Sequence, residues 1–206
     1  MPAVRVILVV VGFFLSAMTA CCQRVTVHVF TEDKPVPPGN DTIYYNFNRG
    51  LTWADFKGKP DPDHFAGAVT ASGFAFDSQM NYDGTTVRLD IGVYTFFTKS
   101  DSWKKKDIHS AYHLLHEQHH FDISRLGAAN FMEAVQKAHF TRSNYNKLLV
   151  AIFDRTYKDN ADLQHLYDRE TNHSIDMPMQ RVWNKRIARA MQQLQSGISS
   201  PRPNAL

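Results

Sequence analysis

Five consecutive residues, His116-Glu117-Gln118-His119-His120, have the types and the spacing that metal-assisted hydrolysis needs. In an α-helix, side chains four residues apart lie on one face, so His116 and His120 can reach a single zinc ion. Glu117 points about 100° away from His116, toward the neighbouring side of that ion. There a carboxylate can take a proton from water and pass it to a leaving amine. The pentapeptide therefore predicts a zinc metallopeptidase with Glu117 as its general base.

Other polar residues of the same predicted helix are less suited to the ion. His113 lies seven residues from His120, about 10 Å along the helix axis, and His109 is farther still. We therefore interpret His109 and His113 as residues that do not share the ion. His119 points to a different side, which predicts a structural role. Asp122 is placed either to orient a ligand or to lie at the surface.

A tetrahedral catalytic zinc site needs a third protein ligand and leaves its fourth position for water. No cysteine occurs from residue 23 onward, so this ligand must be His, Asp or Glu. The stretch 167–176 could fold back over the helix. His173 is the first choice there, because a predicted loop can aim its side chain at the ion. Asp168 and Glu170 are the alternatives.

Helices are predicted in the second half of the chain. Three segments there have helical spacing: 108–139 after a capping cluster at 100–102, 144–158 with an extension over 163–169, and a last helix from Pro178 to about Gly197. The first of these segments carries the H-E-x-x-H motif. The motif is therefore expected on a helix.

Strands are predicted in the first half, where apolar residues alternate with polar ones at 24–30, 43–47 and 86–97, and where the segment 65–76 is rich in small residues. Asp83-Gly84 is typical of a hairpin turn, so the last two strands should be antiparallel. The edge of strand 86–97 could bind an extended peptide, a hypothesis that a central position in the sheet would exclude. Strands followed by helices predict an α+β fold. We expect an antiparallel sheet and then a helical half carrying the active-site helix, as in zincin-like peptidases.

The first 22 residues have the pattern of a signal peptide. Arg5 is followed by uncharged, largely apolar residues over 6–20 and then by small residues. The apolar run is shorter than the ~20 residues that a membrane-spanning helix needs. Residues 18–21 imperfectly match a bacterial lipobox, so lipidation of Cys21 would tether the protein to a membrane, and simple cleavage would release it. The protein is therefore predicted to be exported, and periplasmic, secreted or lipid-anchored.

The composition suits a single domain over residues 23–197 and a disordered Ser/Pro-rich tail over 198–206. Of 206 residues, 43% are hydrophobic and 12% aromatic, enough to build a core. The net charge is only +3, and the one dense basic run, Lys104-Lys105-Lys106, suits a solvated surface. This argues against a nucleic-acid partner. The expected partner is a peptide or protein substrate.

Three segments together resemble a group of exported bacterial proteins, catalogued as a domain of unknown function and predicted to be zinc-dependent proteases. These segments are L-T-W-A-D-F at 51–56, H-E-Q-H-H-F-D-I at 116–123 and Y-D-x-x-T-x-H at 167–173. The resemblance covers most of the chain from about Asn40 to Leu194. Its helical motif is the most specific part.

The resemblance implies a complete zinc site. It places zinc ligands at His116, His120 and His173, with Glu117 as the catalytic residue. His119 departs from the family, which often has Gly at this position. That departure adds bulk near the site but removes no ligand.

Two alternative functions stay open from the sequence. A non-catalytic metal-binding or cell-envelope interaction module would keep the two histidines and would not need Glu117. A peptidase that cleaves the stem peptides of peptidoglycan would use the same zinc site as a protease.

Overall fold

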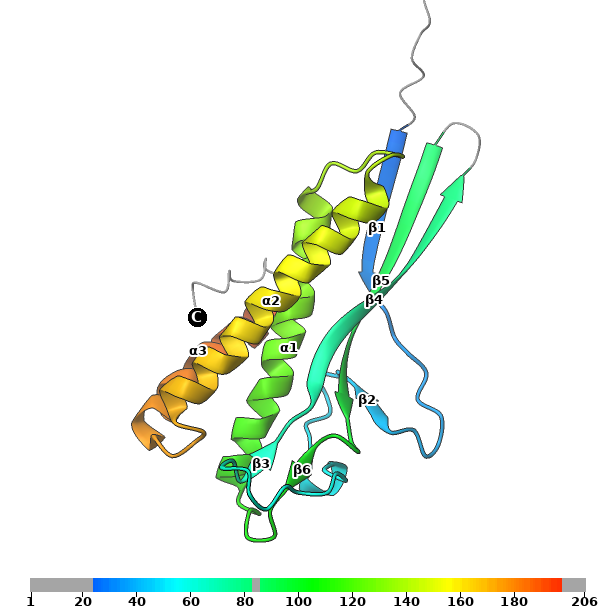
Figure 1. Cartoon of the computed structure of the whole chain (residues 1–206). Coiled ribbons are helices and arrows are strands. Elements are labelled where there is room, and N and C mark those ends of the chain that lie inside the picture. The colour runs from blue at the N-terminus through cyan, green and yellow to red at the C-terminus, as the bar shows by residue number, and fades with distance from the viewer. Residues whose placement is uncertain (1–23, 83–85, 198–206) are drawn as a thin grey trace, which may run out of the picture.

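The computed structural model describes residues 24–82 and 86–197 of the chain (Figure 1). Several predictions lie outside these described residues: the signal peptide over 1–22 with Cys21, the turn at Asp83-Gly84, and the tail over 198–206. Within the described part of the chain, no helix combines the length and the apolar character needed to cross a membrane.

One four-stranded sheet has β5 (Thr86–Thr98) at its centre. β4 (Ser72–Tyr82) pairs with β5 in antiparallel orientation, as the sequence predicts. β1 (Arg24–Thr31) and β2 (Thr42–Tyr44) share the other edge of β5, with β1 along its first half and β2 at its end. The predicted edge role of strand 86–97 is therefore wrong, because β5 has neighbours on both sides and cannot add an extended peptide.

The sheet is mixed, so the prediction of an antiparallel sheet is wrong for one strand. β1 runs parallel to β5, with Val25 opposite Val87 and Val29 opposite Ile91. Alternating apolar residues decide which face of a strand is buried, but they do not decide its direction. The predicted α+β class is confirmed, because three helices follow this sheet.

The strand predicted at 65–76 is divided into two. Its first part, β3 (Ala68–Val69), pairs with β6 (Trp103–Lys104) in a small separate sheet. β4 begins only at Ser72. The break between β3 and β4 brings a short stretch of chain against the first helix, where it contributes to the site described below.

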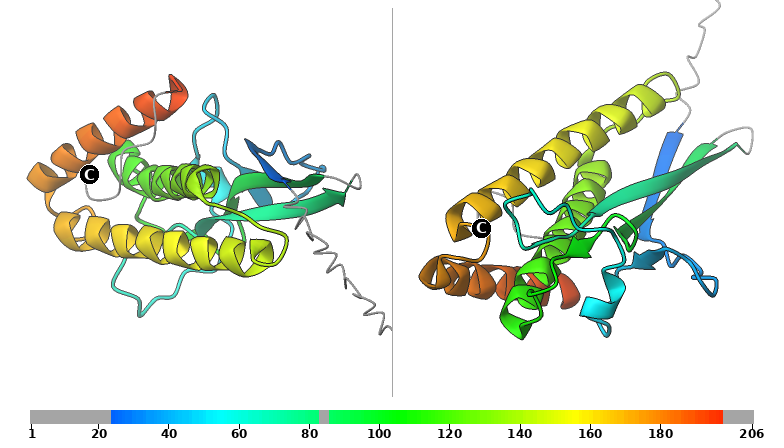
Figure 2. Two further views of the ribbon diagram at one scale, coloured as in Figure 1. Left: turned by 90° about the horizontal axis from the view of Figure 1, so that it is seen from above. Right: turned by 60° about the horizontal axis from the view of Figure 1, so that its bottom comes forward.

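Three long helices follow the sheet: α1 (Ala111–Lys137), α2 (Tyr145–Thr171) and α3 (Met177–Gln195). Of these, α1 and α2 pack on one face of the sheet, and α3 packs against α1 and α2 (Figures 1 and 2). All three lie where helical spacing predicts them, and the two predicted pieces of α2 form one continuous helix. Pro178 lies in the first turn of α3, as predicted. Figure 2 shows α1 between α2 and α3.

The start of α1 differs from the prediction. The helix begins after Ser110, whose hydroxyl accepts a hydrogen bond from the backbone N–H of His113 at 3.1 Å. The capping cluster predicted at 100–102 is wrong. Ser102 instead donates to the carbonyl of Thr98 at 2.7 Å, so it stabilises the turn after β5.

The two halves of α1 have different surroundings. The C-terminal half buries Phe131 against Phe74 and Ile91 of the sheet. At the middle, Gly127 permits close packing, since a Cβ there would lie 2.6 Å from Asn160 Nδ2 of α2. The N-terminal half carries the H-E-x-x-H residues. The sheet and α2 therefore fix the position of the motif.

Candidate metal centre

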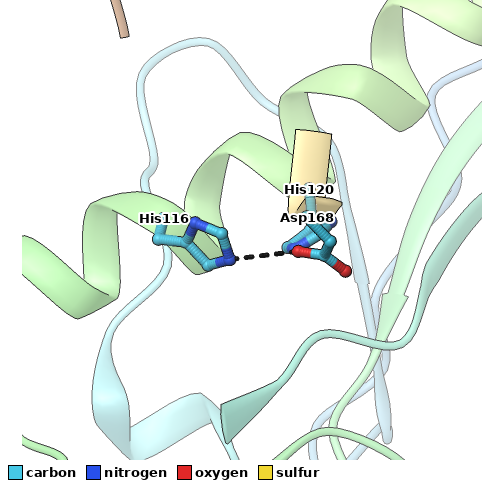
Figure 3. A group of neighbouring side chains, drawn as sticks. All are labelled: His116, His120 and Asp168. Carbon is cyan, nitrogen blue, oxygen red and sulfur yellow. Dashed lines mark ion pairs between the residues drawn. The ribbon is translucent and has the colours of Figure 1, made fainter. Parts of the chain in front are cut away.

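His116 and His120 lie one turn apart on α1, and Asp168 of α2 faces both of them (Figure 3). Asp168 Oδ1 lies 3.3 Å from His116 Nε2 and 3.0 Å from His120 Nε2. The three residues offer donor atoms that all lie within 4.8 Å of one another. This group could hold a metal ion.

Two glutamines contact the other ring nitrogen of each histidine. His116 Nδ1 lies 2.9 Å from Gln180 Oε1, and His120 Nδ1 lies 2.6 Å from Gln164 Oε1. An amide oxygen only accepts hydrogen bonds, so each Nδ1 must donate. Tyr167 packs over the pair, with its ring stacked on His116 at 4.7 Å and edge-on to His120 at 5.1 Å.

The donor set fits a divalent metal ion. Asp168 Oδ1 is buried, and in the described part of the chain it has no hydrogen-bond donor beside it unless Nε2 of His116 or His120 carries a proton. When His116 and His120 are neutral and donate through Nδ1, their Nε2 lone pairs point toward this same oxygen. A buried acceptor without a partner costs free energy. One ion bound by two imidazoles and a carboxylate would satisfy all three atoms.

In the metal-free protein a proton takes the place of the ion. Burial alone would lower the pKa of His120, but the hydrogen bond and charge of Asp168, together with the charge of Glu117, raise it to about 9. Burial alone would raise the pKa of the Asp168 carboxyl group. Its contacts with His116 and His120 instead hold that pKa below the ordinary value. The group is therefore a carboxylate beside at least one protonated imidazole.

Glu117, the predicted general base, is buried next to this group with 5% of its surface exposed. Thr70, in the break between β3 and β4, donates from its hydroxyl to Glu117 Oε2 at 2.7 Å. This contact holds one of the two carboxylate oxygens in place. The catalytic role of Glu117 stays a prediction.

His173, predicted as the third ligand, lies beside the group of donors. Its Nδ1 is 3.6 Å from Asp168 Oδ1, and its side chain is 32% exposed. Asn172, His173 and Ser174 have left-handed backbones, with φ of 47°, 51° and 71°, where α2 ends. Phe65, itself 73% exposed, meets the His173 ring at 4.6 Å. Asp168, an alternative from the sequence, completes the group, and the ligand role of His173 stays a prediction.

Other residues singled out from the sequence make structural contacts. Glu170, the remaining alternative ligand, accepts a hydrogen bond from Trp183 Nε1 of α3 at 2.9 Å. His119 Nδ1 lies 2.9 Å from Asp122 Oδ2. Asp122 also accepts from the Tyr45 hydroxyl at 2.8 Å, so it orients His119 and links α1 to the segment after β2.

The L-T-W-A-D-F segment braces the motif from the side of the sheet. The backbone N–H of Leu51 donates to Gln118 Oε1 at 2.7 Å. Phe56 is buried in the same cluster as Phe97 of β5 and Phe121 of α1. Two of the three segments that carry the family resemblance are therefore in direct contact.

Sequence reasoning missed Gln164, Gln180 and Thr70. Gln164 stands four residues before Asp168, which places both side chains on one face of α2, and this spacing could have found it. Gln180 and Thr70 come from other elements at no fixed spacing from the motif. Only the tertiary structure brings them to the histidines and to Glu117.

Comparisons of the chain with protein-family models, with curated proteins and with solved structures gave no match.

Proposed function

We propose that this protein is a zinc-dependent metallopeptidase of zincin-like fold. One observation carries the proposal: His116, His120 and Asp168 converge within 4.8 Å, and Glu117 follows the first ligand in sequence. The two-histidine, one-carboxylate set leaves a coordination position free, which is the arrangement of catalytic zinc sites. The resemblance to exported, predicted zinc-dependent proteases supports the same function.

Zinc is the metal that the donor types favour. Imidazole and carboxylate ligands together suit zinc, whereas magnesium and calcium prefer oxygen ligands alone. His116, His120 and Asp168 would hold the ion, and His173 is close enough to Asp168 to approach it. Bound zinc would supply Lewis acidity, which lowers the pKa of water and polarises a carbonyl group.

The residues of the chain have separate tasks in the proposed reaction. Glu117 takes a proton from the attacking water at Oε1 and delivers it to the nitrogen of the leaving amine. The hydroxyl of Thr70 holds Oε2, so that the carboxylate keeps one orientation during both transfers. Tyr167 covers the histidines, and its burial raises the pKa of its hydroxyl, which therefore stays protonated.

The proposed setting is outside the cytoplasm. The signal-peptide pattern over 1–22 supports export, with release or with a membrane tether through Cys21 as the two outcomes. The substrate class is a peptide or protein. No residue of the centre distinguishes a protein substrate from a peptidoglycan stem peptide.

The function is tested by metal analysis and peptide hydrolysis on wild type and Glu117→Gln. We expect one zinc per chain in both proteins, and hydrolysis of an unstructured protein substrate by wild type alone. Zinc bound without hydrolysis of protein or stem peptides by either form would instead favour a non-catalytic metal-binding module. No zinc in either would contradict both functions.

A further inference from the structure

The two histidines of the centre are held in the same way, by carboxamides from two different helices. Gln164 lies on α2 and Gln180 on α3, and each presents Oε1 to a histidine Nδ1. Metal-binding histidines commonly donate this N–H to a carboxylate or a backbone carbonyl. Carboxamides on both histidines therefore call for a physical reason.

The orientation of the Gln164 side-chain amide is fixed by its neighbours, above all by a backbone carbonyl oxygen that can only accept a hydrogen bond. Its Nε2 donates to the backbone carbonyl of His120 at 2.9 Å and lies 3.2 Å from Ser124 Oγ. Turning the amide over would place two oxygens in contact, which is unfavourable. Oε1 must therefore face His120 Nδ1, and Nδ1 must carry a proton to donate to it. In this way the backbone carbonyl of His120 fixes the tautomer of the His120 ring through Gln164.

Gln180 is 1% exposed, and its Nε2 group also donates to two acceptors. Its Nε2 donates to the Tyr167 hydroxyl at 2.7 Å and to Asn184 Oδ1 at 2.7 Å. Its Oε1 is left to accept from His116 Nδ1. These partners differ from those of Gln164 in one respect. Gln164 donates to a backbone carbonyl, which can neither donate nor turn over, whereas both partners of Gln180 are side chains: the Tyr167 hydroxyl can also donate, and the Asn184 amide can turn over.

We propose that Gln164 and Gln180 are positioning residues of the metal centre. By accepting from Nδ1, they keep a proton on that nitrogen of each ring, so that Nε2 faces Asp168 and is the nitrogen that would bind a cation. A carboxamide is needed because each residue must accept from a ring N–H and also donate to a neighbouring acceptor, and a carboxylate cannot donate. The inference rests on the proposed metal site but not on peptidase activity.

The surroundings of the two glutamines predict unequal responses to the same change. In Gln164→Glu, the second carboxylate oxygen would face the His120 carbonyl, which cannot turn away. In Gln180→Glu, the Tyr167 hydroxyl can donate to the new oxygen and Asn184 can turn its amide. A carboxylate also makes the imidazole a stronger ligand. Zinc binding should therefore weaken in Gln164→Glu and stay equal or tighten in Gln180→Glu.

The experiment measures zinc affinity by competition with a chelator, and the visible absorption spectrum of the cobalt(II) form, which reports ligand geometry. Gln164→Leu and Gln180→Leu should each weaken zinc binding by roughly 10- to 100-fold and alter the cobalt spectrum. The matched control is Gln192→Leu, an exposed glutamine on α3, which should bind zinc as wild type does. Thermal unfolding of the metal-free variants checks that each is folded.

Unchanged zinc affinity and cobalt spectrum in both folded Leu variants would overturn the proposal. Wild-type affinity in Gln164→Glu would overturn the requirement for a carboxamide. Gln180 is buried and Gln164 is partly exposed, so Gln180→Leu is the variant more prone to misfold. If it does not fold, unchanged zinc affinity and cobalt spectrum in Gln164→Leu alone would overturn the proposal. A protein that binds zinc as expected in all variants but cleaves no peptide would refute the proposed function and leave this inference standing.

Discussion

The two halves of α1 are buried by different means. Around Phe131, the helix meets Phe74, Leu89 and Ile91, and burial depends on shape and apolar area. Around His116, polar side chains face the interior, and hydrogen bonds or ion pairs fix those of His116, Glu117 and His120. Mutations in the C-terminal half should change the stability of the fold, and mutations in the N-terminal half should change metal binding. The two halves can therefore be separated by experiment.

The largest effect is expected at the apolar end. Phe131 is 0% exposed, and Phe131→Ala should lower the free energy of unfolding by about 3 to 5 kcal/mol, because it leaves a cavity. Urea unfolding of the metal-free protein measures this change. Val150→Ala, at a side chain 46% exposed on α2, is the control and should change stability by less than about 0.5 kcal/mol. A loss under 1 kcal/mol for Phe131→Ala would remove the contrast between the halves.

The second prediction concerns the third ligand at the polar end. Asp168→Asn should weaken zinc binding on the order of 100-fold, since each ligand contributes about 3 kcal/mol to a typical site. His173→Asn keeps a residue that tolerates the left-handed backbone and should weaken binding less than about tenfold. Both are measured by chelator competition. The reverse ranking would make His173 the third ligand, as the sequence favoured.

The third prediction is a pH dependence confined to the polar end. The pKa of His120 is raised to about 9 in the metal-free protein, so zinc must displace a proton at neutral pH. Zinc affinity should rise about tenfold per pH unit from neutral pH to about 9 and then level off. Calorimetry in buffers of different ionisation enthalpy should count about one proton released at pH 7. In Asp168→Asn the count should fall, and an equal count would contradict the assigned cause.

The same raised pKa has a defined effect on stability. Because the folded value exceeds the ordinary value of about 6.5, protonated His120 stabilises the metal-free fold fully below that pH. The contribution is lost as pH rises through about 9. Zinc-loaded protein, in which no proton binds there, should lack this dependence.

The smallest effect is expected at the first turn of α1. Ser110→Ala removes the side-chain acceptor for the N–H of His113 and should cost about 1 kcal/mol of stability. Thermal unfolding measures it. Asp176→Ala, at the equivalent cap of α3, offers a comparison, because Asp176 accepts from Met179 N–H. A change at Ser110 as large as at Phe131 would mean that the polar end controls global stability.

Local patterns predicted much of the fold. The helices were found because apolar residues recur at helical spacing, and the pairing of β4 with β5 because both alternate on either side of a turn sequence. The parallel direction of β1 was not predicted, because Val25, Val27 and Val29 lie on the same face of the strand whichever way it runs. The position of β5 at the centre of the sheet depends on long-range pairing, which alternation does not encode.

The candidate metal centre likewise contains residues that local spacing predicted and residues that only the tertiary structure places. His116 and His120 follow from spacing within one helix. The choice between Asp168 and His173 depends on where α2 ends, and α2 continues through Asp168 and stops at three left-handed residues. Gln180 reaches His116 only because α3 folds back beside α1. Residues that act through the tertiary structure of three helices leave no periodic trace in the sequence.

The direction of β1 also decides how the protein would present its centre if it were tethered. β1 begins at Arg24, at the end of the sheet away from the N-terminal half of α1 (Figure 1). Eight residues of strand span about 25 Å. An anchor at Cys21 would therefore join the molecule at one pole and leave His116 and His120 at the other. A protein tethered in this way would present the candidate metal centre on the side that faces away from its membrane.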